Sequence, residues 1–309
     1  MKTINNTLAA YNKNLMDKPS FIREMYQSHH AGLFDYSAHL GKTNIKKIEI
    51  EDDCVIMTTR DRGLRMLCVP GDFRVAPIET LNFFDYEKSD SAMMDRLIFD
   101  GDVFFDIGAN MGWYSINQAL SHRTSKIYCF EPIPKIYSYL QKNLALNATA
   151  NVSAFNFGFS NQSGTFDFYY YEEGSGNASA VNLTGRSDVL VCQCKVRTLD
   201  DFSNEIQTPI DFIKCDVEGA ELMVFQGGIQ TISRDLPIVF SEILRKWSSK
   251  FNYNPNEILD LFRSLGYRVF TADDNSLKEF STMNDDTVET NFFFLHPEKH
   301  ARQLKQLCK

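Results

Sequence analysis

The fold is decided by one stretch of the sequence, Val103-Phe104-Phe105-Asp106-Ile107-Gly108-Ala109-Asn110-Met111-Gly112. Its first five residues are apolar except for Asp106, which is typical of a strand buried on both faces of a sheet. The two glycines favour a tight turn and let the backbone approach a ligand, because they carry no Cβ atom. Asn110 stands where many such loops have a third glycine, and asparagine tolerates the left-handed conformation better than most residues. The stretch therefore predicts a buried strand followed by a ligand-binding turn.

Downstream of this stretch, strand patterns and helix patterns alternate. We expect strands at 103–107, 126–130, 151–157, 210–215, 236–240, 267–271 and 291–295, and helices at 113–120, 135–146, 220–226 and 256–265. Such alternation indicates a mostly parallel sheet covered by helices on both faces, an α/β fold. Between the third and fourth strands, two strand-like runs at 165–171 and 189–196 flank a segment of small residues, 172–180. That segment is either a lid or binding loop over a site or a solvated hairpin tip.

Upstream of residue 83 the pattern is different. Residues 1–40 have a loosely helical period that Pro19 interrupts, and residues 45–80 switch to the period of two that is typical of strands. We expect an N-terminal helical and β-rich appendage over 1–82 and the main domain over 83–309. The helical part is interpreted first as a cap on the main domain, with an arm that joins two copies into a homo-oligomer as the alternative.

Composition and charge exclude several classes of protein. The net charge of −8 is a poor match for a nucleic-acid binder, which usually needs a basic surface. The seven cysteines form no C-x-x-C pair, so they indicate free thiols in a reducing compartment. The first residues lack the apolar core of a signal peptide, and no run of about 18 apolar residues could span a membrane. These features predict a cytoplasmic protein without a membrane span.

A second acidic residue indicates what the glycine loop binds. Glu131 ends the next strand, where a carboxylate can accept hydrogen bonds from the two hydroxyls of a ribose. Asp106 lies just before the glycines, where it would repel a pyrophosphate but suits an ammonium group. The loop alone permits a dinucleotide or S-adenosylmethionine. The two acids favour S-adenosylmethionine.

At this point the sequence resembles the FkbM family of S-adenosylmethionine-dependent methyltransferases, over roughly residues 86–297. The resemblance rests on blocks that occur in order, namely Gly101 to Ser115, Phe130-Glu131-Pro132, Thr198 to Phe202 and Ile210 to Glu221. It implies a Rossmann-like methyltransferase sheet of seven strands. It also implies methyl transfer to an oxygen, typically a hydroxyl of a sugar, a glycan or a natural product.

Carboxylates that end the fourth and fifth strands are the candidate catalytic residues. Asp216 and Glu218 follow the fourth strand and Glu242 ends the fifth, so we expect all three at the same edge of the sheet. A carboxylate there can orient or deprotonate an acceptor hydroxyl. The three could also hold a divalent metal by their oxygens, but hydrogen bonding to a sugar without a metal is the simpler interpretation. Asp216 and Glu218 could instead cap the following helix.

The expected cofactor contacts extend from the glycine loop to its neighbours in the fold. They comprise Glu87, Asp106, Gly108, Ala109, Asn110, Gly112, Tyr114, Glu131, Pro132, Gly158, Phe159 and Asp216. Two alternatives to an O-methyltransferase stay open. One is an N-methyltransferase of a protein or nucleic acid, although such enzymes often carry Asn-Pro-Pro-Tyr where this chain has Cys215-Asp216-Val217-Glu218. The other is a non-catalytic cofactor-binding subunit.

Overall fold

The computed structural model describes residues 3–171, 173–273 and 275–308, and its centre is a mostly parallel sheet. The order of the strands is β14-β13-β15-β12-β11-β4-β5-β6. Their bounds are β4 (Val103–Ile107), β5 (Lys126–Phe130), β6 (Val152–Phe155), β11 (Phe212–Cys215), β12 (Ile238–Glu242), β13 (Arg268–Asp273), β14 (Ser276–Glu279) and β15 (Asn291–Leu295). Strand β15 runs antiparallel to both of its neighbours. The predicted seven-stranded Rossmann-like sheet is confirmed, and β14 adds an eighth strand at one edge.

The strand order reverses between β4 and β11. From β4 the chain builds outward through β5 and β6, then returns to place β11 and β12 on the other side of β4. Ile107 and Cys215, the last residues of β4 and β11, are paired. The loops that follow these two strands therefore start side by side, at the position where ligands bind in open α/β sheets.

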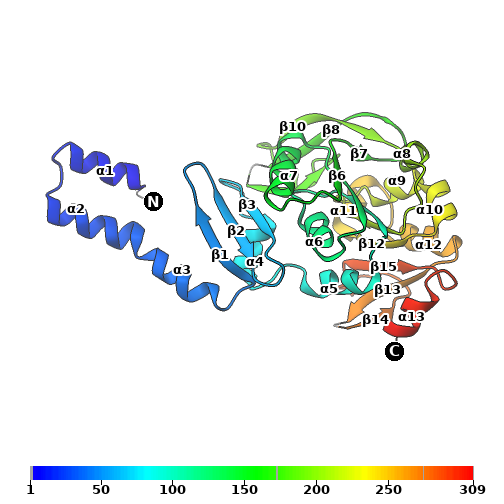
Figure 1. The fold of residues 1–309 in the computed structure, drawn as a ribbon. Coiled ribbons are helices and arrows are strands. Elements are labelled where there is room, and N and C mark those ends of the chain that lie inside the picture. Colours follow the sequence, from blue (N-terminus) through cyan, green and yellow to red (C-terminus); the bar gives the residue numbers. More distant parts are fainter. Residues whose placement is uncertain (1–2, 172, 274, 309) are drawn as a thin grey trace.

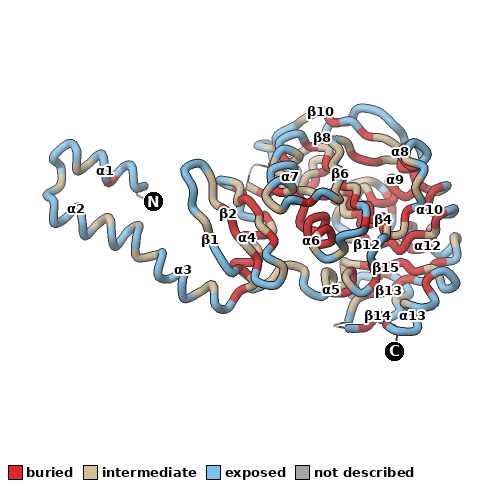
Figure 2. The backbone as a smooth tube through the Cα atoms, viewed as in Figure 1, coloured by how far each residue is buried: buried red, intermediate tan, exposed pale blue. Residues whose placement is uncertain are grey.

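Two hydrophobic clusters cover the faces of the sheet. Alternate residues of one strand enter opposite clusters, so Phe104 packs into one and Phe105 into the other. The surrounding helices are α5 (Lys88–Leu97), α6 (Trp113–Ser121), α7 (Pro134–Leu146), α8 (Leu199–Ile206), α9 (Glu221–Gln226), α10 (Ile229–Asp235), α11 (Arg245–Ser248), the 3-10 turn η2 (Ser249–Phe251), α12 (Asn256–Ser264) and α13 (Ala301–Leu307). Figure 2 shows the buried backbone concentrated in this body of the molecule.

A second sheet is inserted between β6 and α8. Its strands are β7 (Gly158–Phe159), β8 (Gly164–Tyr171), β9 (Gly174–Ser179) and β10 (Leu190–Arg197), in the order β7-β10-β8-β9. The small-residue segment that sequence analysis treated as a lid or a hairpin tip therefore contains a strand, β9, paired with β8. Glu172, also in that segment, lies outside the described residues. Gly176 of β9 lines a cavity of 540 Å³ that is described with the candidate active site below.

The N-terminal region has two parts. An antiparallel meander consists of β1 (Ile45–Ile50), β2 (Val55–Thr59) and β3 (Arg65–Cys68), and α4 (Ala76–Phe83) follows it. Before the meander, α1 (Ile4–Asn12), α2 (Lys18–Met25), the π-helical turn η1 (Tyr26–His30) and α3 (Gly32–Leu40) form an arm that extends away from the body (Figure 1). None of the described helices combines the length and apolar character needed to cross a membrane.

The arm corrects the interpretation of residues 1–40 as a cap. Its helices extend away from the body in Figure 1, and no residue of 1–40 lines the cavities described below at the carboxyl edge of the sheet. Pro19 stands in the first turn of α2, a position that tolerates proline because the N–H group it lacks has no helical partner there. The helical period thus predicted the helices, but a period cannot show what a helix packs against.

Candidate active site

The loop after β4 adopts backbone conformations that few residue types favour. Gly108 has a φ of +75°, and a Cβ atom on it would lie 1.9 Å from the carbonyl oxygen of Asp216. The amides of Gly108 and Ala109 both donate to the carbonyl oxygen of Phe130, at 3.1 and 3.0 Å. Asn110 has a φ of +49°, which confirms that asparagine occupies the left-handed region here. The loop after β4 therefore passes directly against the loop after β11.

Glu131 holds the other side of this loop. Its Oε2 atom accepts a hydrogen bond from the amide of Asn110 at 3.1 Å, and Oε1 accepts one from the amide of Ile133 at 2.9 Å. Burial raises the pKa of this carboxyl to about 7, against the opposing effect of the two backbone donors. Each oxygen keeps a further lone pair, so the fixed carboxylate can still accept two hydroxyl groups.

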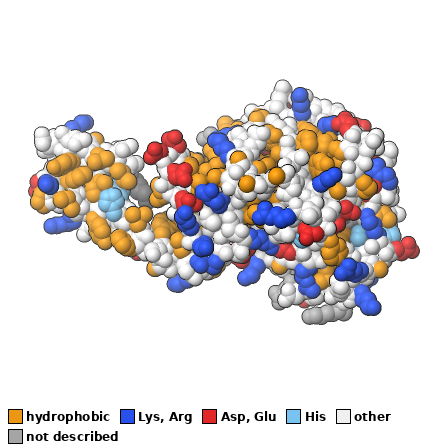
Figure 3. Space-filling model, in the orientation of Figure 1, with side chains coloured by type: hydrophobic (Ala, Val, Ile, Leu, Met, Phe, Trp, Pro, Cys, Tyr) orange, Lys and Arg blue, Asp and Glu red, His pale blue; other side chains and the backbone are white. Residues whose placement is uncertain are grey.

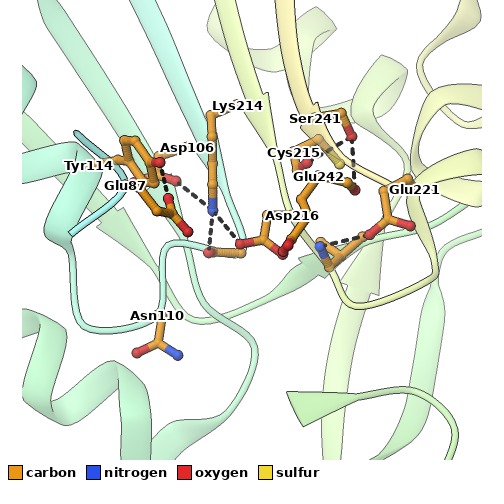
Figure 4. A network of polar contacts seen from close by, with 12 residues as sticks. Glu87, Asp106, Asn110, Tyr114, Lys214, Cys215, Asp216, Glu221, Ser241 and Glu242 are labelled. Carbon is orange, nitrogen blue, oxygen red and sulfur yellow. Dashed lines mark hydrogen bonds and ion pairs between the residues drawn. The ribbon is translucent and has the colours of Figure 1, made fainter. Parts of the chain in front are cut away.

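Lys214 was not predicted as a site residue, yet it joins the two loops. Its Nζ atom donates to the carbonyl oxygen of Gly108 at 3.0 Å and lies 3.2 Å from Oδ2 of Asp216. Oδ1 of Asp106 is 3.6 Å away, and both side chains of this pair are almost fully buried. Figure 4 shows the lysine between the two aspartates. A basic residue within the apolar strand pattern of 210–215 was the signal that could have identified it.

Asp106 is buried behind the loop and binds Ser115. One of its oxygens, Oδ2, accepts hydrogen bonds from the amide and the hydroxyl of Ser115, at 3.0 and 2.6 Å. The side chain is fully buried and lines none of the three cavities described below, so the structure does not bring it to face a ligand directly. Gly112 likewise lies behind the loop, with Leu140 where its Cβ atom would be.

Glu221 fixes the conformation of the loop after β11. Its Oε1 atom accepts hydrogen bonds from the amides of Val217 and Gly219, at 3.1 and 3.0 Å. The N-cap of α9 is Ala220, and no side chain caps this helix. The interpretation of Asp216 and Glu218 as helix caps is therefore wrong, and both carboxylates are free to face the site.

Three carboxylates meet at this edge of the sheet. Oxygens of Asp216, Glu218 and Glu242, one from each side chain, all lie within 4.8 Å of one another. Figure 4 shows Asp216 and Glu242 directed toward each other from neighbouring strands. Burial raises the pKa of Glu218 and of Glu242, and repulsion from Asp216 raises both further. The structure thus brings together the three predicted catalytic residues.

Glu87 lies near this carboxylate cluster and comes from the segment that precedes α5. It precedes α5 with a φ of +43°, and the hydroxyl of Tyr114 donates to its Oε2 atom. Burial raises the pKa of Glu87 to about 7. Three of the non-glycine residues with positive φ, Glu87, Asn110 and Glu218, lie at this site, and others lie elsewhere in the chain.

Three adjoining cavities, all lined by Gly108, follow the carboxyl edge of the sheet. The first has a volume of 540 Å³ and is lined by Glu87, Asp216 and Glu242 among others. The second, of 60 Å³, lies against Glu131 and Pro132. The third, of 370 Å³, is mainly apolar and is lined by Pro132, Gly158 and Phe159 among others. The predicted cofactor residues other than Asp106 and Gly112 line one or more of these cavities.

The largest cavity also contains residues that sequence analysis did not propose. Met66 lines it from β3, and the segment from there to the end of α4 contributes Arg74, Val75, Ala76, Glu79 and Phe83. Lys246 and Trp247 line it from α11. Part of the cavity wall is therefore formed by residues of the N-terminal appendage.

Comparison with known proteins gives matches to methyltransferases. A family model described as the methyltransferase FkbM domain matches residues 106–269. A methyltransferase of Sordaria araneosa, sdnD, is 31% identical over 151 residues, which make up 40% of this chain and 58% of that protein. The 2-O-methyltransferase NoeI of Sinorhizobium fredii is 28% identical over 148 residues, 43% of this chain and 59% of that protein. The matched parts thus amount to less than two thirds of each relative.

Among solved structures, a methyltransferase FkbM from Methylobacillus flagellatus aligns with 64% of this chain and 44% of its own length. The TM-score is 0.42 and the sequence identity 18%.

Proposed function

The chain belongs to the methyltransferase FkbM family, and from that premise we propose that it transfers a methyl group from S-adenosylmethionine to a hydroxyl group of a sugar, a glycan or a natural product. The observation that carries the proposal is the meeting of Asp216, Glu218 and Glu242 beside the glycine loop, within a cavity large enough for an acceptor. The similarity to a 2-O-methyltransferase agrees with an oxygen acceptor.

The three cavities suggest how the cofactor lies. The apolar cavity suits the adenine, with Phe159 and Pro132 in its wall. Glu131 would accept the ribose hydroxyls in the small cavity, as its fixed carboxylate allows. The methionine part would then pass Gly108 toward Glu87, whose carboxylate can accept a hydrogen bond from the ammonium group. This arrangement puts the methyl group near Asp216.

The protein contributes little covalent chemistry to the reaction. The acceptor oxygen attacks the methyl carbon, the S–CH₃ bond breaks with its electron pair left on sulfur, and an O–CH₃ bond forms. The hydroxyl proton passes to a carboxylate of the cluster, and burial raises the pKa of two of them, Glu218 and Glu242, which makes these two better proton acceptors than ordinary carboxylates. Holding the two reactants in line supplies much of the rate enhancement.

The test is methyl transfer from isotopically labelled S-adenosylmethionine to saccharide and small-molecule fractions. We expect label in an O-methyl ether, identified by nuclear magnetic resonance, and loss of transfer in Glu242→Gln with cofactor affinity largely kept. Label in an amine of protein or RNA would instead support an N-methyltransferase. Tight cofactor binding without transfer to any fraction would support a non-catalytic subunit.

A further inference from the structure

The carboxylate cluster has the spacing of a set of ligands for one metal ion. The three oxygens lie within 4.8 Å of one another. Ligands on opposite sides of Mg²⁺, Mn²⁺ or Ca²⁺ are about 4 to 5 Å apart, because each metal–oxygen distance is roughly 2.0 to 2.6 Å. A single cation can therefore reach all three side chains with small adjustments.

Glu218 supplies a second and independent observation. Its Oε2 atom is buried and has no hydrogen-bond partner among the described residues. The nearby ammonium group of Lys214 is 3.2 Å from Asp216 and is shared with the carbonyl oxygen of Gly108. A buried carboxylate oxygen without a partner is costly, so its position beside two further carboxylates favours the binding of a cation there.

The side chains around the cavity are predominantly acidic. Six carboxyl groups and three basic side chains line the 540 Å³ cavity, so a cation bound there would meet more acidic than basic groups.

We propose that Asp216, Glu218 and Glu242 bind one hard divalent cation, Mg²⁺ or Mn²⁺, and that this cation holds the acceptor through two neighbouring oxygens. The inference rests on the proposed function and narrows its substrate class to acceptors with adjacent oxygen groups, such as a vicinal diol. Three protein ligands leave coordination positions for the two acceptor oxygens and for water.

The cation also changes where the proton goes. A hydroxyl bound to a divalent cation is more acidic than a free one, so it loses its proton to water in the open cavity. The carboxylates act as ligands in this arrangement and do not accept the proton. The methyl group still moves from sulfur to oxygen as described above.

The test uses the full chain saturated with S-adenosylhomocysteine and measures Mn²⁺ binding by electron paramagnetic resonance. We expect one Mn²⁺ per chain, displaced by Mg²⁺. We expect Glu218→Gln and Glu242→Gln each to weaken Mn²⁺ binding by about tenfold or more. Both variants remove mutually repelling carboxylates, so the fold should be kept, and thermal unfolding checks this.

Glu79→Gln is the matched control. Glu79 lines the same cavity, but its carboxylate is paired with Arg74 at 2.6 Å and is not in the cluster. This variant makes the same change in charge and should leave Mn²⁺ binding unchanged. An equal loss in Glu79→Gln would overturn the site in favour of diffuse attraction by the acidic cavity.

Failure of the metal site is distinguishable from failure of the proposed function. Absence of Mn²⁺ binding at millimolar concentration, together with full methyl transfer in excess EDTA, would overturn the cation while the O-methyltransferase proposal stands. Specific Mn²⁺ binding that Glu242→Gln abolishes, in a protein that transfers no methyl group, would support the cation site and overturn the function.

Discussion

At the scale of single residues, Gly108 is the position where a substitution is most informative. An alanine there would meet the carbonyl oxygen of Asp216 at 1.9 Å and would adopt an unfavourable φ of +75°. The backbone cannot move aside as a flexible side chain can, so the loops after β4 and β11 must separate. We predict that Gly108→Ala weakens S-adenosylhomocysteine binding by at least about tenfold, or about 1.4 kcal/mol, measured by calorimetry.

Gly63 provides a control that separates strain from contact. Its φ of +67° is close to that of Gly108, but no heavy atom lies within 4 Å of the position that a Cβ atom on it would take. Gly63→Ala should cost about 1 kcal/mol of stability and leave binding unchanged. Equal binding losses in both variants would show that the loop contact has no special role.

The pKa of Glu131 predicts that cofactor binding depends on pH. Burial raises this pKa to about 7 in the free protein, and ribose hydroxyls donate more strongly to the ionised form. Binding should therefore release protons, and affinity should fall as the pH drops below about 7, by at most about tenfold per unit for this group. Calorimetry in buffers of different ionisation enthalpy measures the protons released.

The variant Glu131→Gln isolates this contribution. Glu87 also has a pKa raised to about 7, so the variant should reduce the proton release without abolishing it. A dependence of cofactor affinity on pH that is identical to that of the unaltered protein would contradict the assigned role.

The raised pKa of Glu131 affects the stability of the free protein in the opposite direction. The folded state binds more protons than the unfolded chain, so the contribution of Glu131 to stability falls as pH rises from about 4.5 to 7.

At the scale of elements, Lys214 connects the loops after β4 and β11. Replacing it with methionine removes the cation between Asp106 and Asp216 and the hydrogen bond to Gly108. Breaking a buried ion pair on one side typically costs about 3 to 5 kcal/mol, because the remaining charge stays buried. We predict a loss of this order for Lys214→Met in denaturant unfolding monitored by circular dichroism.

A second substitution tests the reason for that loss. If the uncompensated charge of Asp106 is responsible, the double variant Asp106→Asn with Lys214→Met should be more stable than Lys214→Met alone. A double variant that is less stable would show that the lysine acts through packing, for example through the ring of Tyr114, whose centroid is 5.4 Å from Nζ.

The elements of the sheet were predictable from the sequence, and the inserted β9 was not. Strand β4 and strand β15 have the predicted bounds, since runs such as Asn291 to Leu295 combine apolar residues with clear ends. Strand β9, in contrast, consists of glycine, serine, asparagine and alanine, which have low strand propensity. It is a strand because β8 supplies its hydrogen-bond partners, a tertiary effect that no local pattern contains.

The candidate site was predictable to a similar degree. Positions at strand ends follow from topology, so Asp216 and Glu242 could be placed at one edge from the sequence alone. Contacts between loops could not be predicted from the sequence, since the distance from Lys214 to Gly108 depends on how two turns meet. The cavity wall contributed by residues 66–83 was beyond prediction for the same reason.

At the scale of the whole molecule, helix α4, which lies at the junction of the proposed appendage and the main domain, is expected to select the acceptor. Phe83 ends α4, is 68% exposed and lines the large cavity, where a bound acceptor would cover it. We predict that Phe83→Ala raises the KM for the acceptor several-fold, because apolar contact is lost. The affinity for S-adenosylhomocysteine should not change. Phe73→Ala is the control, since Phe73 is 59% exposed but does not line the cavity.

The N-terminal arm has the composition of an interface rather than of a solvated helix. Ile22, Leu33 and Phe34 are 56%, 55% and 66% exposed, and further apolar side chains lie along the same helices. Figure 3 shows hydrophobic atoms gathered over this arm. Exposed apolar patches of this kind mark interaction surfaces. We therefore keep the proposal that the arm joins two copies of the chain.

Light scattering after size-exclusion chromatography tests this association. The full chain should behave as a dimer or larger at micromolar concentration, and the triple variant Ile22→Ser, Leu33→Ser, Phe34→Ser should be a monomer of unchanged stability, because the free chain does not bury these side chains. Val288→Ser, at an 85% exposed position on the body, should leave the association intact. A full chain that is already monomeric would refute the role of the arm. A monomeric variant that still binds S-adenosylhomocysteine would show that the arm serves assembly and that each copy carries a complete cofactor site.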